Sequence, residues 1–240
     1  MERLDKLLCS QGTLTRSEAG RVIRSGRVTV DGAVCRQPAQ KLDPHTQKIA
    51  VDGKALGYAE YVYWMLNKPA GILCVSRDPK APTVVDLLPA DQRRRGLFPA
   101  GRLDKDTHGL VLITDDGEFA HRMLSPRHHI PKTYLARLDK PLTEAGAEAF
   151  RAGPLLEDGT QCQPAQLRLL ETGDNPLVEV VIYEGKYHQI KRMFAAVGCH
   201  VEWLKRIKMG DLTLDESLEE GMCRPLTAEE KTSILNENFA

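Results

Sequence analysis

The feature that most constrains this chain is a polar turn that leads directly into an apolar strand. The stretch GRLDKDTHGLVLIT covers residues 101–114, and it places Arg102, Asp104 and Asp106 just before the apolar run 110–113. A short apolar run bounded by turn residues is typical of a strand that is buried on both faces. Charges this close to a core have two interpretations: Asp104 caps backbone amides of the turn, or the charges belong to a site.

The composition limits the kind of protein that can carry this motif. The 240 residues are 42% hydrophobic and 28% charged, which suits one large domain or two smaller domains. No apolar run approaches the roughly 20 residues that span a bilayer, and the N-terminal segment lacks the apolar stretch of a signal peptide. Six cysteines occur without a C-x-x-C pair, so we expect a reducing, cytoplasmic location without disulfides or a zinc site.

Residues 1–57, which we call the head, are predicted to form a separate small domain. Leucines at 4, 7 and 8 have the spacing of an amphipathic helix, and a capping box at 15–18 opens a second helix. Asp31-Gly32 then predicts a hairpin turn between two short strands. Residues 1–41 contain eight Lys or Arg against four Asp or Glu, although the whole chain has no net charge. The head is therefore the part that favours an anionic partner.

Two helices followed by a hairpin, with arginines on the exposed face, resemble the S4 RNA-binding domain. The resemblance implies that the head contacts the RNA backbone, which gives affinity but little choice of sequence. A solvated surface is the alternative explanation for any single arginine. The head residues expected to contact RNA are Arg3, Arg16, Arg21, Arg24 and Arg27.

Residues 58–240 are predicted to form one α+β domain, with a mixed or antiparallel sheet and helices at its periphery. Strands outnumber possible crossover helices, which argues against a doubly wound sheet. The predicted strands are 61–66, 72–76, 109–114, 133–138 and 177–183. The predicted helices are 118–124, 142–153, the second half of 184–198, and 225–237.

Two further polar clusters follow the motif at 101–114. Lys132 and Tyr134 stand at the start of a predicted strand, and the segment 184–193 places Lys191 at the start of a predicted helix. Strand ends and helix starts are common positions for functional side chains. If an aspartate, a tyrosine and a lysine converge there, the cation keeps the carboxylate ionised.

The motifs together resemble those of the pseudouridine synthase family, in its ribosomal small-subunit pseudouridine synthase A branch. The segments that carry the resemblance, in the family's order, are KPAG (68–71), GRLDKDTHGLVLIT (101–114), KTY (132–134) and EGKYHQIKRMFAAVG (184–198). The resemblance implies an isomerase that breaks the N1–C1′ bond of a uridine in RNA, turns the base and rejoins it through C5. Neither a cofactor nor a metal is expected, and the chain has no GxGxxG motif or P-loop.

The resemblance also implies roles for individual residues. Asp104 is the expected catalytic carboxylate, either as a nucleophile at C1′ or as the base that removes a ribose proton. Tyr134 is expected to stack on the extruded uracil, and Lys191 to keep Asp104 ionised in a dry pocket. Arg102 is expected to fill the space left by the base or to hold a phosphate, with a structural ion pair as the alternative. Further RNA contacts are expected from Lys68, Arg127, Lys132 and Arg192.

The expected substrate is ribosomal RNA within a ribosomal-subunit assembly intermediate, and the protein is expected to be a monomer without a membrane partner. The S4-like head and the short acidic C-terminal segment favour uridine 516 of small-subunit 16S rRNA over a site in large-subunit rRNA. A non-catalytic S4-domain assembly protein is the alternative from another class. The presence of Asp104, Tyr134 and Lys191 argues against it.

Changing Arg16, Arg21 and Arg24 to alanine together should weaken RNA binding and flatten its dependence on salt. Removing one phosphate-binding side chain lowers the slope of log K against log salt by about 0.7–0.9, because fewer counterions are released. The measurement is the affinity for ribosomal RNA between about 50 and 200 mM salt. An unchanged slope in the triple variant would place these arginines away from the RNA.

Overall fold

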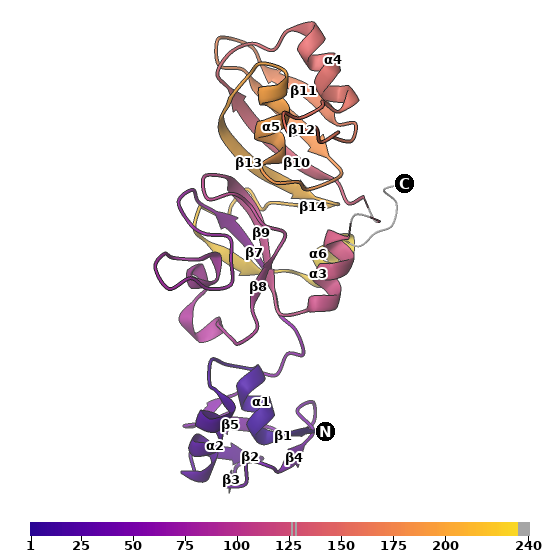
Figure 1. Cartoon of the computed structure of the whole chain (residues 1–240). Coiled ribbons are helices and arrows are strands. Elements are labelled where there is room, and N and C mark those ends of the chain that lie inside the picture. Colours follow the sequence, from indigo (N-terminus) through magenta and orange to yellow (C-terminus); the bar gives the residue numbers. More distant parts are fainter. Residues whose placement is uncertain (126, 128, 235–240) are drawn as a thin grey trace.

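The computed structural model describes residues 1–125, 127 and 129–234. Figure 1 shows an elongated molecule with the head at one end and the main domain as two further lobes. The middle lobe is built around β7 (Tyr63–Lys68), β8 (Phe98–Ala100) and β9 (His108–Thr114). The outer lobe is built around β10 (Lys132–Leu138), β11 (Gln166–Glu171), β12 (Leu177–Ile182) and β13 (Val201–Met209).

The head has the predicted order of two helices and a hairpin. Thr15 Oγ1 accepts a hydrogen bond from Glu18 N, and the Glu18 carboxylate accepts one from Thr15 N, so the expected capping box is present. Asp31 and Gly32 have φ values of 52° and 84°, as a tight hairpin turn requires. The apolar side chains of the head close a core of their own. Its elements are β1 (Glu2–Arg3), α1 (Leu4–Ser10), α2 (Arg16–Arg24), β2 (Val28–Val30), β3 (Ala33–Cys35), β4 (Lys41–Leu42), β5 (Ile49–Val51) and β6 (Lys54–Ala55).

Arg94 joins the head to the middle lobe. Its buried guanidinium donates to Gln11 Oε1 (3.0 Å) and Ala59 O (2.8 Å), and it forms an ion pair with Asp115 (2.5 Å). Tyr58 packs against the core of the head, so the domain boundary expected after residue 57 stays a prediction.

The main domain is built on a nine-stranded mixed sheet, which confirms the predicted α+β class. The order along its main path is β11-β12-β10-β13-β9-β7-β15, where β15 is Cys223–Pro225. β14 (Leu212–Thr213) pairs beside β13, and β8 pairs beside β9. The pair β13–β9 is parallel and short, with Lys205 opposite His108 and Arg206 opposite Gly109, whereas the other pairs are antiparallel. The outer and middle lobes therefore meet along this short parallel pair.

Gly109 makes this close approach of the lobes possible. It has a φ of 99°, and a Cβ atom at this position would overlap the backbone oxygen of Arg206. Arg206 is only 2% exposed, and its guanidinium donates to Leu110 O (2.8 Å) and Gly101 O (3.0 Å). The start of β9 and the turn before it are thus both held against β13.

Helices lie at the periphery of the sheet, as predicted. α3 (Gly117–Leu124) and α6 (Ala228–Ser233) lie beside the middle lobe, whereas α4 (Glu144–Ala152) and α5 (Gln189–Ala196) belong to the outer lobe. Two 3₁₀ turns cover Val84–Leu87 and Ala90–Gln92. In the described ranges, no helix is long and apolar enough to cross a membrane.

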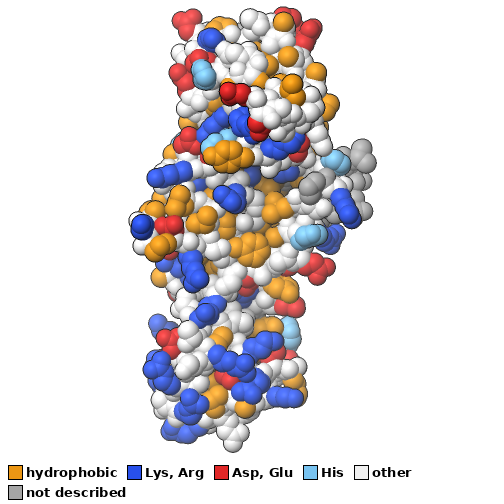
Figure 2. All heavy atoms as spheres, in the orientation of Figure 1, with side chains coloured by type: hydrophobic (Ala, Val, Ile, Leu, Met, Phe, Trp, Pro, Cys, Tyr) orange, Lys and Arg blue, Asp and Glu red, His pale blue; other side chains and the backbone are white. Residues whose placement is uncertain are grey.

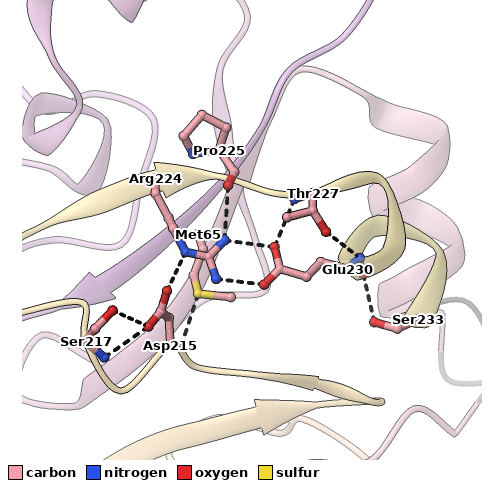
Figure 3. A network of polar contacts seen from close by, with 8 residues as sticks. All are labelled: Met65, Asp215, Ser217, Arg224, Pro225, Thr227, Glu230 and Ser233. Atoms are coloured by element: carbon pink, nitrogen blue, oxygen red, sulfur yellow. Dashed lines mark hydrogen bonds and ion pairs between the residues drawn. The ribbon is translucent and has the colours of Figure 1, made fainter.

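An arginine clamp holds the C-terminal helix (Figure 3). Arg224 Nε donates to Asp215 Oδ2 (2.7 Å), and Arg224 Nη1 and Nη2 donate to the two carboxylate oxygens of Glu230 (2.8 and 2.7 Å). Glu230 also closes the capping box with Thr227 at the start of α6. The Glu230 carboxylate therefore fixes the start of α6 and also links this helix to β15 through Arg224.

The structure corrects two of the predicted elements of the main domain and adds strands that were not predicted. The segment 72–76 is not a strand, because the chain turns away from the sheet at 69–71 and only Leu73 forms an isolated bridge, to Thr83. In the main domain, five strands were not predicted: β8, β11, β13, β14 and β15. Of the predicted helix 225–237, α6 covers only Ala228–Ser233, and residues 235–237 lie outside the described residues.

Candidate active site

A small pocket lies at the seam between the outer and middle lobes, where the polar motifs meet. Its volume is about 100 Å³. Figure 2 shows Lys and Arg side chains gathered at this level, between the two lobes. The lining residues are Arg102, Leu103, Asp104, Thr107, Tyr134, Ile182, Gly185, Lys186, His188, Gln189, Ile190, Lys191 and Leu204. The structure thus brings together side chains from three motifs that are far apart in the sequence.

Lys68 fixes the turn that carries Asp104 through hydrogen bonds to the backbone of that turn. The Lys68 side chain is 0% exposed, and its Nζ donates to Pro69 O (3.0 Å), Lys105 O (3.1 Å) and Thr107 O (2.9 Å). Burial lowers the pKa of Lys68. Gly71 N also donates to Lys105 O (2.8 Å), so the turn after β7 and the turn before β9 are tied together.

These contacts do not support the expectation that Lys68 binds RNA. All three protons of an ammonium group can donate, and those of Lys68 have backbone acceptors inside the protein. A fully buried ammonium cannot reach a phosphate at the surface. In the structure, the lysine of the sequence motif KPAG therefore supports the turn that carries Asp104.

Asp104 lies between a lysine and a histidine. Lys191 Nζ is 3.5 Å from Asp104 Oδ2, and His188 Nε2 is 3.4 Å from Asp104 Oδ1. Lys191 is closer to a second carboxylate, 2.5 Å from Asp106 Oδ1, and this hydrogen bond lowers the pKa of Asp106. The predicted neighbourhood of Asp104 and Lys191 is therefore present, but Asp106 was missed. The only sign of it in the sequence is the second aspartate of the DKD triplet.

The pocket is more open than the expected dry site. The side chains of Asp104 and Lys191 are 27% and 25% exposed, and that of Asp106 is 73% exposed. Water therefore reaches the carboxylates when no RNA is bound. Bound RNA must exclude this water if the charges are to act in a medium of low dielectric constant.

Tyr134 and Lys132 lie on the same strand, β10, but in different surroundings. Tyr134 is buried and lines the pocket, so its ring forms part of the wall. Lys132 is half-buried, and its Nζ donates to Ile130 O (2.8 Å). Burial, with a smaller contribution from Arg206, lowers the pKa of Lys132 to about 8. A phosphate contact from Lys132 is therefore not supported, because its ammonium is turned to the backbone.

The arginines expected to bind RNA differ in their exposure and in whether they form ion pairs within the protein. Arg102 is exposed at the edge of the pocket, and Arg127, Arg21 and Arg24 are also exposed. The others form ion pairs within the protein: Arg3 and Arg16 with Asp5, Arg27 with Asp52, and Arg192 with Asp158. Their contacts with RNA stay predictions. Within residues 1–125, 127 and 129–234, no three His, Cys, Asp or Glu side chains are grouped as metal ligands.

Comparison with known proteins identifies the family. Residues 62–196 match the model of the family described as RNA pseudouridylate synthase, and residues 2–49 match the S4 domain. Ribosomal small subunit pseudouridine synthase A of Escherichia coli (strain K12) is 46% identical over 97% of this chain and 100% of its own. An uncharacterized RNA pseudouridine synthase of Bacillus subtilis (strain 168) is 43% identical over 98% of both chains. A crystal structure of a pseudouridylate synthase, 41% identical, covers 98% of this chain and 100% of its own with a TM-score of 0.65.

The chain therefore belongs to the RNA pseudouridylate synthase family and carries an S4 domain at its N-terminus. It is an enzyme that isomerises uridine to pseudouridine in RNA. RNA is its partner, and the predicted class of reaction is confirmed. The alternative of a non-catalytic assembly protein is set aside.

Lys191→Met should slow pseudouridine formation and move the acidic limb of the pH–rate profile to higher pH. Lys191 lowers the pKa of Asp106 and lies 3.5 Å from Asp104. Without this cation the negative charges beside it are no longer offset, so the ionised form of the site is lost earlier as the pH falls. Lys191→Arg keeps the charge and should retain appreciable activity. Rates measured from about pH 4 to pH 8 cover the range in which carboxylates titrate. An unmoved limb with normal turnover would remove Lys191 from the site.

Proposed function

We propose that this protein converts a uridine of small-subunit ribosomal RNA to pseudouridine through the carboxylate of Asp104. The observation that carries the proposal is the place of Asp104 in the pocket, 3.5 Å from Lys191 and 3.4 Å from His188. A carboxylate is ordinarily ionised at neutral pH, which is the form that a nucleophile or a base requires.

The proposed reaction begins when the target uridine leaves its stack and enters the pocket. Tyr134 stacks on the uracil. If Asp104 is the nucleophile, its carboxylate displaces N1 from C1′, and C5 of the turned uracil then displaces the carboxylate from C1′. If Asp104 is the base, it removes a ribose proton as the N1–C1′ bond breaks, which gives a glycal-like intermediate, and the proton returns to the ribose when C5 bonds to C1′. In both routes the uracil loses its C5 proton and N1 gains one. Lys191 offsets the negative charge of Asp104, and Arg102 at the pocket edge fills the space left by the base or holds a phosphate.

The small subunit is supported as the target by two features. The Escherichia coli relative, which matches this chain over nearly its full length, is named for the ribosomal small subunit. The second feature is the combination of the S4 domain with a C-terminal segment, residues 209–240, that carries eight Asp or Glu against two Lys or Arg. We propose uridine 516 of 16S rRNA as the target, in a cytoplasmic assembly intermediate of the subunit, with the enzyme acting as a monomer.

Mapping pseudouridines in ribosomal RNA tests the target. The RNA is taken from the source organism with the gene intact, with the gene deleted, and with the deletion complemented. One pseudouridine in small-subunit rRNA should disappear on deletion and return on complementation. Loss of a pseudouridine from large-subunit rRNA alone would contradict the proposed target without affecting the family.

Asp104→Asn should abolish turnover while folding and RNA affinity stay close to those of the wild type. The two side chains are nearly isosteric, but only the carboxylate can act as a nucleophile or base. Asp106→Asn is the matched control, because it removes the other carboxylate that faces Lys191 and should keep substantial activity. Pseudouridine formed by the pure Asp104→Asn variant would exclude Asp104 as the catalytic group. A large loss of melting temperature would instead indicate that Asp104 caps the turn.

A further inference from the structure

Tyr187 is an aromatic residue that stands beside the pocket without lining it. Its side chain is 75% exposed, although the neighbours on both sides of it in the chain, Lys186 and His188, line the pocket wall. A large aromatic ring left in water forgoes the stabilisation that burial gives. The proposed reaction uses Tyr134 for the target base and leaves Tyr187 without a role.

One face of the Tyr187 ring is covered by His188. The two ring centroids are 3.8 Å apart, and the planes differ by 21°, which is a stacked arrangement. His188 adopts a left-handed conformation, with a φ of 47° and a ψ of 36°. This uncommon backbone turns the chain sharply at the start of α5. His188 thereby lies between the Tyr187 ring and Asp104, whose Oδ1 is 3.4 Å from His188 Nε2.

Hydrogen bonds hold the segment that presents the ring. Lys186 N donates to Gln189 Oε1 (2.8 Å), and Gln189 Nε2 donates to Glu184 Oε1 (2.6 Å). Arg192 Nη1 donates to Tyr187 O (3.3 Å). Gln189 is itself 5% exposed, so the segment is anchored in the protein. Little conformational entropy remains to be lost when a ligand meets the second face of the ring.

We propose that Tyr187 stacks on the base of a nucleotide next to the target uridine while that uridine occupies the pocket, an inference that rests on the proposed role of the Asp104 pocket. The ring lies outside a cavity of about 100 Å³ and therefore cannot hold the target base itself. Three basic residues lie within five positions of it in the chain, Lys186, Lys191 and Arg192, each of which forms an ion pair within the protein. An exposed aromatic face beside basic residues is the usual means of holding unpaired nucleotides.

The stack also serves the reaction. Extruding one uridine breaks its stacking with its neighbours in the RNA, which costs free energy. A tyrosine ring that covers the base left behind restores part of that stacking. Every base has a flat face, so Tyr187 adds affinity at this position with little choice of sequence. Because the stack persists from binding through the transition state, removing the ring should raise KM more than it lowers kcat.

The test compares Tyr187→Leu, Tyr187→Phe and Tyr61→Leu on the RNA that the wild type modifies. Tyr187→Leu should lower kcat/KM by roughly 5- to 150-fold, mostly through KM, which is the range found when a base loses an aromatic partner. Tyr187→Phe keeps the ring and should stay within about 3-fold of the wild type. Tyr61 is also exposed, at 45%, but it lies beside α6, so Tyr61→Leu should change nothing.

Abasic RNAs identify the stacking partner. The nucleotide before or after the target is replaced by an abasic residue, and each RNA is assayed with the wild type and with Tyr187→Leu. On one of the two RNAs the penalty of Tyr187→Leu should shrink to less than about 2-fold, because the base that stacked is already missing. Equal penalties on all three RNAs, an absent penalty, or a Tyr187→Phe variant as weak as Tyr187→Leu would each overturn the proposal. If the wild type modifies a different uridine from the one proposed, the target assignment fails, and the comparison is carried out at that uridine.

Discussion

The buried ammonium of Lys68 holds together the two turns from which the active site rises. Removing an ammonium group from water is costly unless its donors are satisfied. Here three backbone oxygens, from Pro69, Lys105 and Thr107, accept its hydrogen bonds. Lys68 also ends β7 and pairs with Gly109 near the start of β9. If the turn that carries Asp104 moved away from the sheet, the Lys68 ammonium would remain buried without these hydrogen-bond acceptors.

Arg206 and Gly109 hold the same turn by a second set of contacts. Gly109 allows the backbone of Arg206 to approach, and the Arg206 guanidinium reaches back to Leu110 O and Gly101 O. Between these two buried cations, the turn presents Asp104 at the seam of the lobes, opposite the start of α5. From there His188 contacts Asp104 and carries the stacked Tyr187 ring outward. The buried contacts of Lys68 and Arg206 thus determine the position of the Asp104 carboxylate. Through His188 they also determine the position of the Tyr187 ring, which is proposed to hold the RNA.

The sequence predicted the elements that local chemistry determines. The capping box at Thr15 and the apolar run of β9 depend on residues close in the chain, and both appear as expected. β13 was missed because its charged residues, such as Lys205 and Arg206, hide the apolar positions, and only the folded sheet buries Arg206. The apolar segment 72–76 gave the opposite error. It was predicted to be a strand, but its side chains pack against the core from a loop.

The sequence motifs predicted which residues of the site lie close together, because each motif marks the start or end of a predicted strand or helix. Asp104 and Lys191 were expected to be neighbours, and the structure brings them within 3.5 Å. The closer pairing of Lys191 with Asp106 depends on the exact path of the turn, which spacing alone does not give. Lys68 was expected to contact RNA because the segment KPAG (68–71) resembles one of the family's motifs. Its burial depends on backbone oxygens that are 37 and 39 residues away in the chain.

Amide hydrogen exchange in a Lys68→Met variant tests most directly whether the ammonium holds the Asp104 turn. Methionine keeps most of the volume but donates no hydrogen bonds, so the oxygens of Lys105 and Thr107 lose a partner. The account predicts faster exchange at Gly71, whose amide donates to Lys105 O, and at Thr107, whose amide donates to Asp104 O. The amides of β12 in the outer lobe are the unchanged internal reference. Pseudouridine formation should fall in parallel. Wild-type protection of both amides in an active Lys68→Met variant would contradict the account.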